Sequence, residues 1–105
     1  MCEVLQSNMS EEMKSFAVWL VRGAFADYPD IEERTKHIED KFTKKTREQS
    51  VDPTSYYRCV IPKKSSDLYK YLLELKPVEK HLMITMMLED CVVFVGDVRI
   101  VLPSE

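Results

Sequence analysis

The C-terminal part of the chain, from His81 to Leu102, consists of apolar runs separated by two polar or glycine-containing dipeptides, Glu89-Asp90 and Gly96-Asp97. Short apolar runs separated in this way are typical of strands joined by tight turns. The run 91–95 is apolar at every position, as expected of a central strand that is buried on both faces. The pattern therefore predicts three consecutive strands in an antiparallel meander.

The two dipeptides differ in how well they suit a two-residue hairpin turn. Gly96-Asp97 fits such a turn, because glycine adopts positive φ without steric cost. Glu89-Asp90 does not fit, since neither residue readily takes positive φ. Two interpretations of residues 78–88 therefore stay open, a strand or a helix beginning at Pro77, and the strand is favoured.

A fourth strand is predicted over 56–61, where Tyr57, Cys59 and Ile61 alternate with the residues of the other face before Pro62 ends the run. A short helix should follow, capped by Ser65 or Ser66 and ending before Pro77, because the residue that precedes a proline disfavours helical geometry.

Helical periodicity predicts two longer helices in the N-terminal half. The first begins after a cap at Asn8 or Ser10 and runs to about Tyr28, with two apolar stripes that call for cover on more than one side. The second opens with a capping box at Asp30 and runs to about Gln49. Its thin apolar stripe and its many charges indicate an outer helix.

These elements predict a single α+β domain over 1–105, in the order helix-helix-strand-helix-strand-strand-strand. Two N-terminal helices and the short third helix would cover one face of a mainly antiparallel four-stranded sheet. Residues 1–8 are expected to be a loose lead-in.

Charge and composition favour a cytoplasmic protein that does not enter membranes. Lys and Arg total 15 against 18 Asp and Glu, so the net charge of −3 gives no general attraction to nucleic acid or acidic lipid. No signal peptide is recognisable, and the apolar run Phe16–Val21 is far too short to cross a bilayer. The cysteines Cys2, Cys59 and Cys91 lack zinc-site spacing and are expected to be free thiols, with Cys59 and Cys91 buried and Cys2 reactive.

The sequence offers little for catalysis or for a cofactor. Its two glycines lie far apart, which excludes a dinucleotide fingerprint and a phosphate-binding loop. Glu33, His37 and Asp40 share one helical face with ligand-like spacing, but one helix rarely completes a metal site alone. No catalytic residue, metal or cofactor is therefore expected.

Two groups of residues are candidates for binding. Trp19, Gly23 and Ala26 recur at helical spacing, so a large ring lies beside two small residues and forms a notch for another helix. That helix is either the protein's own second helix or one from a partner. The second group is a basic cluster: Lys41, Lys44, Lys45 and Arg47. Such a cluster could contact nucleic acid with nearby tyrosines as stacking partners, although bases near a helix C-terminus also complement the helix dipole.

The leading hypothesis is a small cytosolic regulatory or inhibitory protein that binds another protein, or a second copy of itself as a dimer, through Trp19, Gly23 and Ala26. Small proteins that viruses and phages use to redirect their hosts often have this character, so a viral source is included as an association. The alternative is a nucleic-acid-associated regulator that uses Lys41, Lys44, Lys45 and Arg47. A small enzyme without a recognisable motif is the third hypothesis.

Overall fold

The structure, a computed structural model, describes residues 2–49, 54–77 and 80–104. The described residues form three helices and a four-stranded antiparallel sheet, which confirms the predicted α+β class. In chain order the elements are β1 (Cys2–Ser7), α1 (Glu11–Asp27), α2 (Ile31–Gln49), β2 (Tyr57–Val60), α3 (Asp67–Glu74), β3 (Met83–Leu88) and β4 (Cys91–Asp97).

The sheet has the strand order β1-β3-β4-β2, and every neighbouring pair is antiparallel. β4 is a central strand, and the side chains of Val92, Val93, Phe94 and Val95 are fully buried. The prediction of a doubly buried run is therefore confirmed for 92–95, whereas Cys91, which was expected to be buried, is partly exposed. The interpretation of 83–88 as strand rather than helix is also correct, while residues 78 and 79 lie outside the described residues.

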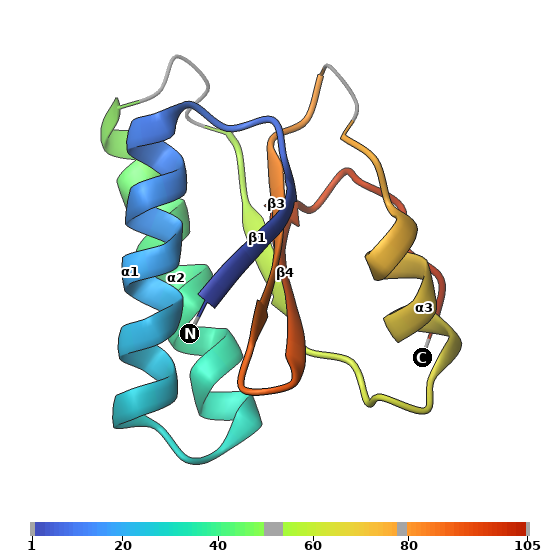
Figure 1. The fold of residues 1–105 in the computed structure, drawn as a ribbon. Coiled ribbons are helices and arrows are strands. Elements are labelled where there is room, and N and C mark those ends of the chain that lie inside the picture. The colour runs from blue at the N-terminus through green and yellow to red at the C-terminus, as the bar shows by residue number, and fades with distance from the viewer. Residues whose placement is uncertain (1, 50–53, 78–79, 105) are drawn as a thin grey trace.

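The helices cover both faces of this sheet (Figure 1). Val93 and Val95 join the cluster beneath α1 and α2, whereas Val92 and Phe94 join the cluster beneath α3. The prediction that all three helices cover one face is therefore wrong. Because side chains alternate across a strand, a strand that is apolar at every position needs cover on both sides.

The fourth strand is β1, so the predicted loose lead-in at 1–8 and the predicted strand at 98–102 are both wrong. Cys2 lies opposite Leu88 in β3, with a bulge between Val4 and Gln6. An edge strand that is half exposed and bulged shows no strict alternation in its sequence, which explains why the pattern missed it. The true order is strand-helix-helix-strand-helix-strand-strand.

The chain turns away after β4 because Asp97 holds a tight local structure. Its carboxylate accepts hydrogen bonds from the backbone N–H of Arg99 at 2.9 Å and from the Arg99 guanidinium at 2.6 Å. The backbone N–H of Ile100 donates to the Asp97 carbonyl at 3.0 Å, and Ile100 then packs into the cluster beneath α3. Residues 98–102 therefore cover the sheet instead of extending it.

The hairpin turn between β3 and β4 is made by Glu89 and Asp90, at φ angles of 50° and 64°. The prediction that this dipeptide does not suit a two-residue hairpin turn is therefore wrong. Left-handed geometry at each non-glycine residue costs roughly 1–2 kcal/mol, and the long β3–β4 ladder offsets this cost. Gly96 is not a turn residue, because it lies within β4 and its φ is not positive. A Cβ atom at this position would overlap Cζ of Phe94. Glycine is needed at 96 to leave room for the ring.

The predicted helix starts agree with the structure in their chemistry. The Ser10 hydroxyl accepts a hydrogen bond from the Met13 N–H at 3.2 Å, and Ser66 caps α3 in the same way. Asn8, the other candidate cap, instead ties the chain to the start of β3 by accepting from the Met83 N–H at 2.8 Å. Within the described ranges, no helix is long and apolar enough to cross a membrane.

Replacing Gly96 with alanine should destabilise the protein through one identifiable contact. The added methyl group would overlap the Phe94 ring, and such overpacking costs about 1–3 kcal/mol. In a Phe94→Leu background most of this cost should disappear, because leucine has no ring carbon at that place. Urea unfolding of the double-mutant cycle measures the coupling. Additive losses would show that the ring does not occupy this space.

Asp97 should make the free energy of unfolding depend on pH in the acid range. The hydrogen bonds from Arg99 hold the pKa of the Asp97 carboxyl below its usual value, although burial opposes the shift. The stabilisation is therefore fully present above the ordinary aspartate pKa of about 3.9 and is lost as the pH falls through the folded-state pKa. Asp97→Asn should show a smaller acid-induced loss of stability in urea unfolding at several pH values. An unchanged loss would contradict this role.

Candidate partner-binding site

Trp19, the only tryptophan of the chain, lies on the outer side of α1 with 69% of its surface exposed. The opposite side of α1 is buried, with Ala17, Val21 and Ala24 fully inaccessible. The indole lies against Phe16, with a ring-centroid distance of 5.9 Å. Trp19 is therefore a large aromatic side chain left in water on a helix whose opposite side is fully buried.

Gly23 and Ala26 are also exposed on α1. A Cβ atom at Gly23 would meet no heavy atom within 4 Å. The notch beside Trp19 is therefore open, and α2 does not fill it. We call the surface of Trp19, Gly23 and Ala26 the Trp19 face.

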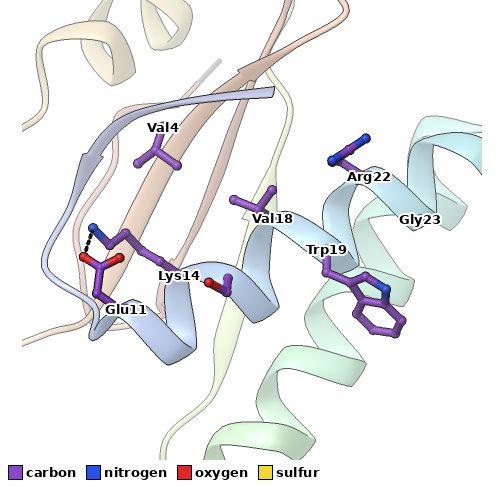
Figure 2. Close-up of a pocket in the computed structure, with 8 residues that line it drawn as sticks. Val4, Glu11, Lys14, Val18, Trp19, Arg22 and Gly23 are labelled. Carbon is purple, nitrogen blue, oxygen red and sulfur yellow. Dashed lines mark ion pairs between the residues drawn. The ribbon is translucent and has the colours of Figure 1, made fainter. Parts of the chain in front are cut away.

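The first groove beside Trp19 lies between α1 and the edge strand β1, and we call it the β1–α1 groove. It has a volume of about 800 Å³ and is lined by Val4, Glu11, Lys14, Ser15, Val18, Trp19, Arg22 and Gly23. Figure 2 shows Val4 and Val18 on facing elements, while the indole of Trp19 points away from both. The Lys14 ammonium forms an ion pair with the Glu11 carboxylate, with an N–O distance of 2.8 Å. Ala26, the third residue of the Trp19 face, does not line this groove.

The second groove lies between α1 and α2, and we call it the α1–α2 groove. Its volume is about 350 Å³, and it is lined by Phe16, Trp19, Leu20, His37, Lys41, Lys44, Lys45 and Glu48. The tryptophan of one predicted site and three lysines of the other therefore share one groove. The sequence presented these two groups as alternatives, but the packing of α1 on α2 joins them.

The three lysines of this groove form no ion pair with any described residue. No carboxylate within the described parts of the chain lies at ion-pair distance from Lys41, Lys44 or Lys45. The Lys45 ammonium lies over the Phe16 ring, 5.4 Å from the ring centroid. Their charges are thus available to a ligand.

Several arginines, in contrast, donate hydrogen bonds to backbone carbonyls of the same chain. The Arg34 guanidinium donates to the carbonyls of Tyr28 and Phe25, and Arg58 donates to the Ile100 carbonyl at 2.8 Å. Arg47 donates to the Ser55 carbonyl at 3.2 Å and lies 4.1 Å from the centroid of the Tyr56 ring. Hydrogen bonding and the charge of Arg47 lower the pKa of Tyr56.

Arg47 therefore differs from the three lysines, because its guanidinium is held by contacts within the fold. The basic-cluster prediction had grouped all four side chains together. Arg47 lines a third groove together with Glu39, Asp40, Glu48 and Tyr56. That groove carries three carboxylates and also Lys44, Arg47 and Arg58, so it lacks the excess of positive charge found on the lysine side of α2.

The imidazoles and thiols have structural surroundings. His37 lies against Tyr28 at a centroid distance of 4.9 Å, and the His81 Nδ1 is 3.9 Å from the Asp97 carboxylate. Burial, followed by the charge of Glu39, raises the pKa of Cys59 far above its usual value, so a thiolate is disfavoured there. Burial also raises the pKa of Cys2, which opposes the predicted reactivity of this thiol.

No group of three or more His, Cys, Asp or Glu residues in the described ranges could hold a metal ion. The sequence matches no protein-family model and no curated protein. The geometry of the chain is therefore the basis for assigning its function.

Glutamine substitutions should separate the free lysines from the structural arginine. Replacing Lys41, Lys44 and Lys45 should change the free energy of unfolding by no more than about 0.5 kcal/mol each, as at most surface sites. Arg47→Gln removes the hydrogen bond to the Ser55 carbonyl and should cost about 1 kcal/mol. Urea unfolding compares the four variants. A larger loss at a lysine than at Arg47 would contradict this division.

Proposed function

We propose that this protein acts by binding another protein through the Trp19 face, and that it regulates or inhibits its partner by occupying a surface of it. The observation that carries this proposal is the exposure of Trp19 between two grooves of an anchored helix. Burying an aromatic side chain of this size removes 150–250 Å² from water by itself. Tryptophan is accordingly enriched among the residues that dominate binding energy at interfaces.

The open notch at Gly23 supports a helical or extended partner element. Because no side chain projects there, a partner backbone can approach α1 closely while its own side chains contact Trp19. The same notch also permits a symmetric dimer, in which α1 of one copy crosses α1 of another. A cytoplasmic location and a viral or phage source remain part of this proposal as associations.

Binding of single-stranded nucleic acid is the second candidate function. It is favoured by the proximity of Trp19 to three lysines that have no ion-pair partner among the described residues. Bases stack on aromatic rings, while cations contact phosphates. The net charge of −3 and the use of Arg47 in a hydrogen bond to the Ser55 carbonyl make nucleic-acid binding the weaker candidate.

Two substitutions on α1 test the proposed docking surface. Gly23→Leu should fill the notch and weaken association, yet keep or raise stability, because leucine is a better helix former than glycine. Trp19→Ala should cost 2 kcal/mol or more of binding if the indole is the anchor. Light scattering measures self-association, and calorimetry against partners recovered from the host measures binding.

The matched control is Tyr71→Ala, which removes a partly exposed aromatic side chain from α3 on the opposite side of the sheet. It should leave association unchanged. A protein that stays monomeric, and whose partners bind Trp19→Ala as tightly as the unmodified chain, would refute the proposal.

A further inference from the structure

We infer that the α1–α2 groove receives an acidic segment of the partner protein, in which an apolar side chain stands next to carboxylates. This inference rests on the proposed docking function and adds the chemistry of the partner. The groove offers two kinds of contact within about 350 Å³, an aromatic surface and a set of ammonium groups. A complementary ligand must therefore carry both an apolar group and negative charge.

The positive charge of the α1–α2 groove comes from lysine side chains of α2. Lys41, Lys44 and Lys45 lie on one side of α2 and have no carboxylate partner among the described residues, whereas Lys14 is already engaged by Glu11. Glu48 is the one carboxylate in the lining, so the groove has an excess of positive charge. Partly enclosed charges of one sign attract ligands of the opposite sign more strongly than isolated surface charges do.

The apolar side chains of the α1–α2 groove come from α1. Phe16, Trp19 and Leu20 line the groove, and the ring of Phe16 is the surface above which the Lys45 ammonium lies. An apolar side chain placed against Trp19 would bring adjacent carboxylates of the same segment within reach of the lysines. Charged pairs of this kind set orientation and association rate, while the aromatic contact provides most of the affinity.

The neighbouring surface favours an acidic peptide over a nucleic acid. The groove on the next side of α2 shares Lys44 and Glu48 with this one and adds Glu39, Asp40, Arg47 and Arg58, so its charges balance. A phosphate chain continuing along α2 would leave the excess of positive charge, whereas a short acidic segment can end within the lysine side. Three lysines also give few phosphate contacts compared with the six to ten of strong nucleic-acid binders.

A short random-peptide display library, selected against the intact protein, provides the probe. Selected peptides should be enriched in Asp and Glu next to a large apolar residue. In titrations that follow the fluorescence of Trp19, the Lys41→Glu/Lys44→Glu/Lys45→Glu variant should bind them at least about tenfold more weakly, equivalent to about 1.4 kcal/mol. The affinity should also fall as salt rises from about 50 to about 500 mM, because added ions screen the charges.

The matched control is Lys64→Glu/Lys70→Glu/Lys76→Glu, which makes the same change in net charge with exposed lysines in or near α3. It should bind the selected peptides like the unmodified protein. Circular dichroism and urea unfolding establish that both triple variants are folded. If both variants bound the peptides equally weakly, the effect would come from the total charge of the protein and not from the groove. This result would overturn the inference.

The remaining outcomes distinguish this inference from the proposed function. Peptides that require Trp19 but not the lysines would overturn the inference and leave the docking surface standing, whereas peptides that require neither would overturn both. A single-stranded thymidine oligonucleotide that perturbs Trp19 more strongly than any selected peptide would overturn it in favour of nucleic acid. Concentration-dependent self-association that the lysine variant abolishes would replace the partner by a second copy.

Discussion

The constraint on which the rest of this structure depends is the apolar character of β4 on both faces. Val93 and Val95 need cover from one side, and Val92 and Phe94 need cover from the other. The short α3 and the segment around Ile100 provide the second cover, so α1 and α2 must share the first face. Their side-by-side arrangement (Figure 1) follows from this division. The side chains of the two helices line the groove between them.

The candidate site is a consequence of how little of α2 is apolar. Ile38 and Phe42 anchor α2 fully, and the rest of the helix is largely charged. Such a helix can seal one side of α1 but cannot cover its outer side as well. Trp19 therefore remains in water, and the lysines on the adjoining side of α2 lie beside it. A thin stripe on one helix thus accounts for both the exposed ring and the charged groove.

Much of the fold could be predicted from the sequence, because helix caps and helical stripes are local signals. Ser10, Ser66 and the Asp30 cap act as their spacing indicated, and the run 91–95 is central. The edge strand β1 and the Glu89-Asp90 turn could not be predicted, since both depend on pairing with β3 rather than on their own residues. The same limit applies to the site. Helical spacing identified Trp19, Gly23 and the lysines, but only packing joins Trp19 to Lys41, and Val4 enters a groove only because β1 is a strand.

The central claim is that the one tryptophan of the chain is exposed in surroundings of positive charge. Quenching of its fluorescence by ions of opposite sign tests this claim without any partner. Iodide should quench Trp19 efficiently and caesium poorly, because the free lysines concentrate anions at the indole. Reversing Lys41, Lys44 and Lys45 to glutamate should reverse this preference. A blue-shifted emission that neither ion quenches would contradict the account.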